Sequence, residues 1–148
     1  MSEILLLNGP NLNMLGSREP ELYGSLTLEK VVSGVTERVE ASGYAVESYQ
    51  SNAEHLLIER VQTAKEVARF IIINPGALTH TSIGLRDALL SVKIPFIEVH
   101  ISNIFAREDF RRRSFLSDIA QGCISGLGVS SYIFAADYAV DWLSKRSV

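Results

Sequence analysis

Phe70-Ile71-Ile72-Ile73-Asn74-Pro75-Gly76 is an uninterrupted apolar run that ends in three turn-forming residues. Such a run predicts a strand buried on both faces, because a strand with one face in water would alternate apolar and polar side chains. Ile4–Leu7, which is followed by Asn8-Gly9-Pro10, repeats the pattern, and Pro95–Ile101 is a further strand candidate. Continuous apolar strands indicate a parallel sheet that is covered on both sides.

Helical periodicity fills most of the sequence between these strands. After Thr27, apolar residues recur at the intervals of one helix face, and Gly43 lies where a glycine commonly ends a helix. Further helices are predicted around residues 57–64, 83–92, 105–121 and 132–144, and further strands at 44–50 and 123–127. Five βα units predict an α/β protein with a flavodoxin-like, doubly wound, five-stranded parallel sheet. We expect residues 1–148 to form a single domain, because no linker, repeat or low-complexity stretch divides them.

The composition argues against several classes of protein. About 47% of residues are apolar, and 14 Lys and Arg stand against 17 Asp and Glu, for a net charge of −3. Nucleic-acid-binding domains are usually strongly basic, so no nucleic-acid partner is expected. Cys123 is the only cysteine, which leaves neither a disulfide framework nor a thiolate cage for a metal. No apolar run approaches the roughly 20 residues of a membrane span, and no basic region of a secretory signal precedes the first apolar run, so we expect a soluble, cytoplasmic protein without membrane association.

In doubly wound folds the ligand site lies beyond the carboxyl ends of the strands. This rule selects residues 8–23, 50–52, 74–82 and 98–103 as the segments that build a site. The first of them holds Asn8, Asn11 and Asn13 beside a Gly-Pro turn, where amides either stabilise the turn or contact a ligand. A flavodoxin would have a hydroxyl- and glycine-rich phosphate loop here and a response regulator an acidic cluster, and this sequence has neither.

Glu98 and His100 are the sharpest candidates for chemistry. They lie two residues apart on a predicted strand, so their side chains point to the same face. A charged glutamate in a buried strand is costly unless it is paired. A structural ion pair is one interpretation, but the position at the carboxyl end of the strand favours a histidine that a carboxylate orients for acid–base work.

Two more strand-end segments allow both a functional and a structural interpretation. Residues 16–24 form a long, glycine-bounded loop that resembles a lid and contains Arg18 and Tyr23, although a loop tyrosine is more often a packing residue. In residues 74–82, Gly76 allows close backbone approach and His80 precedes a helix N-terminus suited to an anionic ligand. The alternative there is that Thr79 or Ser82 merely caps the helix and that His80 is solvated.

Residues 105–113 carry a run of charges. Glu108 with Arg112 and Asp109 with Arg113 have the i,i+4 spacing of helix ion pairs, which is typical of a solvated helix face. Arg111 has no acid four residues before it and could point elsewhere. His55 and Cys123 have no chemical neighbours in the sequence, and no role is predicted for them.

Taken together, these segments resemble the type II 3-dehydroquinate dehydratases, or type II dehydroquinases. The resemblance covers essentially the whole chain, and several specific motifs occur in order and at the family spacing. They are Leu7-Asn-Gly-Pro-Asn-Leu-Asn13, Arg18-Glu-Pro-Glu-Leu-Tyr23-Gly24, Gln50-Ser-Asn52, Asn74-Pro-Gly-Ala-Leu-Thr-His80-Thr-Ser82, Glu98-Val-His-Ile-Ser-Asn103 and Ala106-Arg-Glu-Asp-Phe-Arg111.

The resemblance implies a lyase of the shikimate pathway that converts 3-dehydroquinate to 3-dehydroshikimate by a reversible anti elimination of water through an enolate, without cofactor or metal. It implies that Tyr23, beside Arg18, removes the C2 proton, that Asn11 stabilises the enolate, and that His100, oriented by Glu98, protonates the departing hydroxyl. The implied substrate-binding residues are Asn74, His80 and Arg111 for the hydroxyls, Ile101 and Ser102 for the carboxylate, and Asp87, which resembles a residue that reaches a neighbouring subunit's site.

The family assembles as a dodecamer built from trimers, so the resemblance also implies a homo-oligomer. The sequence leaves open whether the enzyme serves aromatic biosynthesis or quinate catabolism.

Elementary chemistry agrees with these implied roles. A free tyrosine has a pKa of about 10, and a cation within about 4–6 Å can lower it by one to three units, which gives Arg18 a reason to share a loop with Tyr23. No lysine lies in any strand-end segment, so a Schiff-base route has no candidate nucleophile there. The alternatives are a flavodoxin-like binding domain without catalysis and a hydrolase using His80 or His100 with Ser82 or Ser102, although neither serine lies in a recognisable nucleophile elbow.

Overall fold

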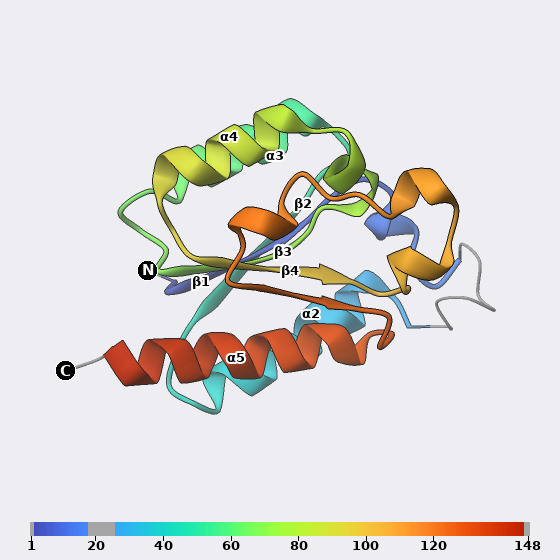
Figure 1. Ribbon diagram of the computed structural model, residues 1–148. Helices are drawn as coiled ribbons and strands as arrows, with labels where there is room; N and C mark the ends of the chain where they lie inside the picture. The colour runs from blue at the N-terminus through green and yellow to red at the C-terminus, as the bar shows by residue number, and fades with distance from the viewer. Residues whose placement is uncertain (1, 18–25, 147–148) are drawn as a thin grey trace.

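The computed structural model of the chain describes residues 2–17 and 26–146, and it has the predicted doubly wound architecture (Figure 1). Five parallel strands form one sheet in the order β2-β1-β3-β4-β5. None of the described helices has the length and apolar composition needed to cross a membrane. The strands are β1 (Ile4–Asn8), β2 (Val46–Gln50), β3 (Phe70–Asn74), β4 (Phe96–His100) and β5 (Gly122–Ser125), and the helices are α2 (Leu28–Glu40), α3 (Glu54–Thr63), α4 (Ile83–Val92) and α5 (Ser130–Arg146).

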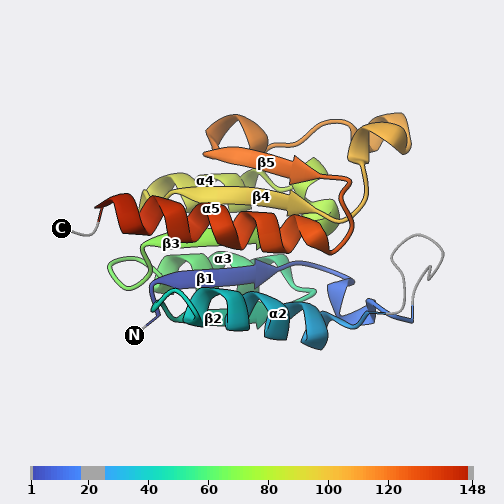
Figure 2. The same cartoon turned by 90° about the horizontal axis from the view of Figure 1, so that it is seen from below.

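Alternate residues of the central strands pack into two separate apolar clusters. In β1, Ile4 and Leu6 face the cluster that contains α2 and α5, whereas Leu5 and Leu7 face the one that contains α3 and α4. Figure 1 shows the sheet between these two helix layers. The strands β1, β3 and β4 are buried throughout, while β2 and β5 form the partly exposed edges. Because all five strands are parallel, their carboxyl ends meet at one side of the molecule, where the arrowheads point in Figure 2.

Helix α2 forms as its sequence pattern predicts. The Thr27 hydroxyl accepts a hydrogen bond from the N–H of Lys30 (3.3 Å), which satisfies one of the free donors at the helix N-terminus. Val31, Val35 and Val39 form the buried stripe, and the opposite face is exposed. Gly43 has a φ of +86°, as expected for the residue that ends this helix.

The predicted helix over residues 105–121 is wrong. This part of the chain forms three short 3₁₀ turns, η3 (Ile104–Ala106), η4 (Asp109–Arg111) and η5 (Ser117–Ile119). A 3₁₀ turn stacks residues three apart, so the charges pair as Arg111 with Glu108 and Arg112 with Asp109, and the i,i+4 pairs do not form. Within the described residues the fold therefore has four α-helices rather than five.

The side chain of Ser114 explains why a continuous helix does not form there. Its hydroxyl accepts hydrogen bonds from the N–H groups of Leu116 (3.0 Å) and Ser117 (3.1 Å), which a helix would give to backbone carbonyls. Leu116 is buried in the cluster on the α3 and α4 side, which draws the chain inward over the sheet.

The turns after β1 and β3 pack against each other backbone to backbone. Asn8 and Asn74 are register partners, and the Gly9 N–H donates to the Asn74 carbonyl (2.8 Å). A Cβ atom on Gly9 would lie 2.3 Å from the Pro75 carbonyl oxygen, and one on Gly76 would lie 2.9 Å from that of Pro10. The close approach predicted at Gly76 is thus an approach to the neighbouring turn, and it fixes the two turns relative to one another.

Candidate active site

A pocket of about 140 Å³ opens where the carboxyl ends of β1, β3 and β4 meet. Its walls are the turn after β1, the segment η2 (Gly76–His80) after β3, and the residues that follow β4. This is the position that the rule for doubly wound folds selects. The polar side chains that line the pocket are those of Asn11, Asn74, His80, His100, Ser102, Arg107 and Arg111.

Asn11 is held in the pocket wall by residues after β2. Its backbone has a φ of +70°, a left-handed conformation that asparagine tolerates better than most residues. Its N–H donates to Oδ1 of Asn52 (2.9 Å), and Nε2 of Gln50 donates to the Gly9 carbonyl (3.1 Å). The predicted segment 50–52 therefore contributes by supporting the Asn11 turn.

Asn74 has both ends of its amide fixed. Its Oδ1 accepts from the Gly76 N–H (3.1 Å), and its Nδ2 donates to the hydroxyl of Tyr132 (2.8 Å). The Tyr132 hydroxyl donates in turn to Oδ1 of Asn8 (2.6 Å), so three buried side chains form one chain of hydrogen bonds. Burial raises the pKa of Tyr132 despite the hydrogen bond from Asn74, which keeps the phenol protonated.

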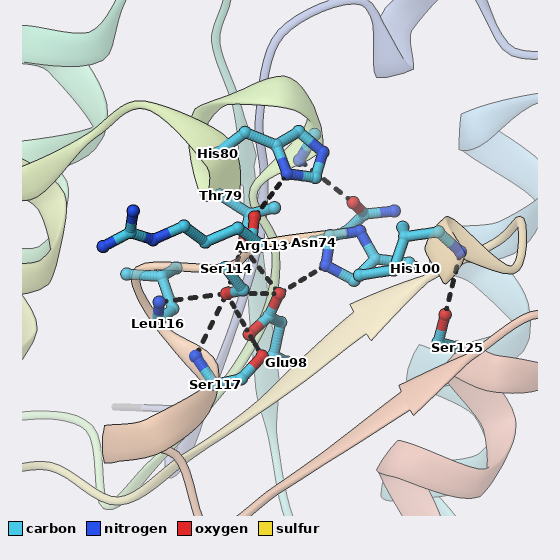
Figure 3. A network of polar contacts seen from close by, with 12 residues as sticks. Asn74, Thr79, His80, Glu98, His100, Arg113, Ser114, Leu116, Ser117 and Ser125 are labelled. Carbon is cyan, nitrogen blue, oxygen red and sulfur yellow. Dashed lines mark hydrogen bonds and ion pairs between the residues drawn. The ribbon is translucent and has the colours of Figure 1, made fainter. Parts of the chain in front are cut away.

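His80 is oriented by the backbone of the segment that follows η4. Its Nδ1 lies 2.6 Å from the Arg113 carbonyl oxygen, which can only accept, so Nδ1 carries the hydrogen (Figure 3). The other ring nitrogen, Nε2, is then the one that can serve the pocket. Ser82, not Thr79, caps helix α4 by accepting from the Leu85 N–H (2.9 Å). The helix cap and the pocket histidine therefore coexist in this segment.

Glu98 and His100 meet as the strand geometry predicts. Both side chains are buried, and Nε2 of His100 forms a hydrogen bond with Oε2 of Glu98. Burial tends to raise the pKa of Glu98, but the hydrogen bond and charge of His100, together with hydrogen bonds from Thr79 and Ser117, outweigh it and lower that pKa. Glu98 is therefore ionised at neutral pH and accepts the Nε2–H of His100, which leaves Nδ1 as the ring nitrogen available to the pocket.

The residues after β4 complete the pocket. The carbonyls of His100 and Ile101 accept from the N–H groups of Gly126 (3.2 Å) and Gly128 (3.0 Å), which anchors this turn to the chain after β5. Nε of Arg111 donates to Oε1 of Glu108 (2.9 Å), and its guanidinium is held at the pocket by this ion pair. Two guanidinium groups, those of Arg107 and Arg111, line one pocket, which suits a ligand rich in oxygen and negative charge.

Most of the predicted site residues lie together. Asn11, Asn74, His80, His100, Ile101, Ser102 and Arg111 line the pocket, and Glu98 lies directly behind His100. Asp87 is exposed on α4 and does not line the pocket of its own chain. Arg18 and Tyr23 lie outside the described residues. Within the described ranges, no three His, Cys, Asp or Glu side chains group closely enough to hold a metal ion.

Sequence reasoning missed Arg107 and Tyr132. Arg107 lines the pocket although its segment looked like a solvated helix face. Tyr132 lies on α5, 58 residues after Asn74, and nothing in the local pattern distinguishes it from an ordinary core residue. The only indication in the sequence is its hydroxyl, because a buried tyrosine usually forms a hydrogen bond with another polar group.

The comparisons with known proteins agree with one another. A model of the family Dehydroquinase class II matches residues 2–140. A protein of Photorhabdus laumondii named 3-dehydroquinate dehydratase is 61% identical over 96% of this chain and 95% of its own length, and one of Thioalkalivibrio sulfidiphilus with the same name is 58% identical over 99% and 100%. The crystal structure of a type II dehydroquinase from Propionibacterium acnes superimposes with a TM-score of 0.89 at 40% identity, covering 95% of this chain and 98% of that one.

Proposed function

The chain belongs to the class II dehydroquinase family and is a 3-dehydroquinate dehydratase, and we propose that it forms 3-dehydroshikimate by an anti elimination through an enolate. The observation that carries this mechanism is the pairing of an ionised Glu98 with His100 at the pocket wall. A flavodoxin-like binding domain without catalysis is not favoured, because the family match spans residues 2–140.

The first step removes a proton from C2 of the substrate, which the neighbouring C3 ketone makes acidic. We assign it to Tyr23 with Arg18 beside it, from the resemblance of residues 18–24 to the family motif. The electrons of the C2–H bond form the enolate, and we assign the stabilisation of its oxygen to the amide of Asn11, which lines the pocket. Tyr132 is unsuited to be the base, because its phenol is buried and donates its proton to Asn8.

The second step breaks the bond between C1 and its hydroxyl oxygen. The enolate electrons form the C1–C2 double bond, and the hydroxyl leaves as water after receiving a proton. His100 supplies that proton from Nδ1, since Nε2 is engaged with Glu98. The negative charge of Glu98 stabilises the doubly protonated ring that this step requires, and the ring becomes neutral as the proton leaves.

The remaining pocket residues bind and orient the substrate. Asn74, His80 and Arg111 are assigned to its hydroxyls, and the backbone of Ile101 and Ser102 with the Ser102 hydroxyl to its carboxylate. The support for these roles is that all five residues line one pocket together with His100. The fixed amide of Asn74 and the carbonyl-bound ring of His80 hold these groups in place before the substrate arrives, which reduces the ordering required on binding.

Assembly forms part of the same proposal. Asp87 is exposed on α4 and away from the pocket of its own chain, which is consistent with a carboxylate that reaches a neighbouring subunit's site. We expect a homododecamer built from trimers, with residues 1–148 as the catalytic domain of each subunit and no cofactor. The cytoplasmic location expected from the sequence stays a prediction.

Incubation with 3-dehydroquinate tests the reaction directly. The product has a conjugated enone, so its ultraviolet absorbance should rise with time and with enzyme concentration. No signal over a broad pH range would contradict the proposed activity.

Substitution of Tyr23 by phenylalanine tests the assigned base. Tyr23→Phe removes one oxygen, so turnover should be abolished while the affinity for substrate and the melting temperature change little. Tyr138→Phe is the matched control, because the Tyr138 hydroxyl reaches only Gln121 (3.5 Å) on a different part of the surface. Near-normal turnover of Tyr23→Phe would remove this tyrosine from the mechanism.

A further inference from the structure

We propose that the hydroxyls of Thr79, Ser114 and Ser117 form a cradle that keeps Glu98 ionised and fixed, and that Ser117 is thereby a positioning residue for His100. The proposal rests on the proposed function, in which His100 is the proton donor. It assigns a purpose to the chain between η4 and η5, where the sequence pattern predicts only a helix with a solvated face.

The cradle surrounds the Glu98 carboxylate on the side away from His100 (Figure 3). Thr79 Oγ1 donates to Oε2 (2.6 Å), and Ser117 Oγ donates to Oε1 (2.7 Å). Ser114 Oγ lies 3.0 Å from Oε1 and 3.1 Å from Oε2. With the His100 ring on Oε2, the carboxylate has four partners, which matches the roughly four lone-pair sites of an ionised carboxylate.

Saturation of these sites favours the charged form of Glu98. Each hydroxyl has a single hydrogen, and an ionised carboxylate can accept all three together with the ring N–H. A protonated Glu98 would have to donate its own hydrogen to one of these oxygens, and the hydroxyl there would turn its hydrogen away from the carboxyl group, as Thr79 and Ser114 can toward each other (2.8 Å). Protonation would therefore replace hydrogen bonds to a charged acceptor by weaker bonds between neutral groups, so the cradle opposes it.

The cradle also connects separate walls of the pocket. Thr79 belongs to η2 after β3, whereas Ser114 and Ser117 come from the chain that returns over the sheet toward β5. The Phe115 N–H donates to the Thr79 carbonyl (2.7 Å), which fastens the two segments beside the carboxylate. The position of Glu98, and through it the ring of His100, is therefore set by elements on both sides of β4.

The charges that face Glu98 give the expected direction of the pH effect. The titratable groups against it are His100 on its own strand and Cys123, its register partner on β5. Partial desolvation and the Glu98 charge raise the pKa of Cys123 to about 11, so the thiol is neutral at neutral pH. The pKa of Glu98 is lowered, so its charge is present at neutral pH and is lost only as the pH falls through that lowered pKa. Removal of one donor raises the pKa of Glu98, so this loss should begin at a higher pH.

The pH dependence of kcat in Ser117→Ala tests the proposal. Loss of one hydrogen bond to the charged carboxylate should move the acidic limb of the kcat profile upward by about one to two pH units. KM should stay near the wild-type value, because Ser117 does not line the pocket. Ser117→Thr, which keeps the hydroxyl, should restore the limb. Ser144→Ala is the matched control, since the exposed Ser144 hydroxyl binds only the Asp141 carbonyl on α5.

If the Ser117→Ala protein does not fold, two further measurements test the proposal. Thr79→Val removes a second cradle hydroxyl with little change of shape and should shift the limb in the same direction. In the wild-type protein, nitrogen NMR of labelled histidine at neutral pH should show the hydrogen of His100 on Nε2, the ring nitrogen bound to Glu98.

The outcomes separate this proposal from the proposed function. An unmoved acidic limb in folded Ser117→Ala or Thr79→Val, a Ser117→Thr protein that restores the melting temperature but not the limb, or a His100 Nε2 without its hydrogen at neutral pH overturns the cradle. An inactive wild-type enzyme would instead count against the proposed reaction, and the NMR measurement would still test the cradle.

Discussion

Helix α2 and the stretch from Glu98 to Ile119 differ in which side chains they bury. In α2 the buried residues are Val31, Val35 and Val39, and the charged side chains are outside. In the second stretch Glu98 is 0% and His100 5% exposed, while Phe105 and Phe110 are 60% and 65% exposed. One region follows the hydrophobic pattern throughout, and the other departs from it at these four residues.

The departure at Glu98 and His100 indicates side chains that are buried for chemistry rather than for packing. Burying a charge is unfavourable unless it is paired and hydrogen-bonded. The Glu98 carboxylate has four hydrogen-bonding partners, an arrangement that packing alone does not require. Helix α2 has a simpler task, which is to cover one face of the sheet. Substitutions of the buried residues of α2 should therefore act on stability, and substitutions of the pocket residues in the other stretch on catalysis.

The largest effect should come from His100→Gln. Glutamine can still donate an N–H to Glu98, so the buried charge keeps a partner, but it cannot deliver a proton. Loss of general-acid catalysis should lower kcat by roughly 10²–10⁴-fold with a smaller change in KM, measured by the absorbance of the product. His55→Ala, on the exposed surface of α3, is the matched control and should behave as wild type. If His100→Gln changed only KM, the acid would lie elsewhere.

A smaller effect is expected from Arg111→Ala. Arg111 lines the pocket, whereas its neighbour Arg112 pairs with Asp109 on the surface. Loss of a charged hydrogen bond to the substrate, worth about 1.5–3 kcal/mol, should raise KM by roughly 10–150-fold, and Arg112→Ala should leave kinetics unchanged. Initial rates over a range of substrate concentrations distinguish the two variants. Equal effects of both substitutions would show that the segment acts through its overall charge.

The same comparison explains how far the sequence predicts the fold. Where side chains separate by polarity, as in α2 and the central strands, periodicity gives the correct elements, and the strand-end rule finds the pocket. The helix prediction for residues 105–121 is wrong for two reasons. Their charged residues have helical spacing but pair within short 3₁₀ turns, and the Ser114 hydroxyl accepts from backbone N–H groups that a helix needs. A single-sequence pattern does not show such competition.

Some residues of the candidate site can also be predicted from the sequence, and others cannot. Glu98 and His100 are predictable because a strand fixes the direction of residues two apart. The partners of Asn74 and Glu98 are not, because Tyr132 and Ser117 come from elements distant in the sequence, and no local periodicity reports those contacts. Sequence thus predicts the groups that face the substrate better than the groups that hold them in place.

Val35→Ala should have the opposite signature to the site variants. Val35 is fully buried in the α2 stripe, and loss of two methyl groups, at about 0.8 kcal/mol per buried carbon plus a cavity term, should destabilise the fold by about 2 kcal/mol. For a domain of this size the melting temperature should fall by roughly 4–8 °C. Below that temperature kcat and KM should equal those of wild type, and Ser33→Ala on the exposed face of α2 should change neither stability nor kinetics. A Val35→Ala protein with a normal melting temperature but a low kcat would contradict the separation of stability from catalysis. It would show that α2 acts on the pocket through the sheet rather than only covering it.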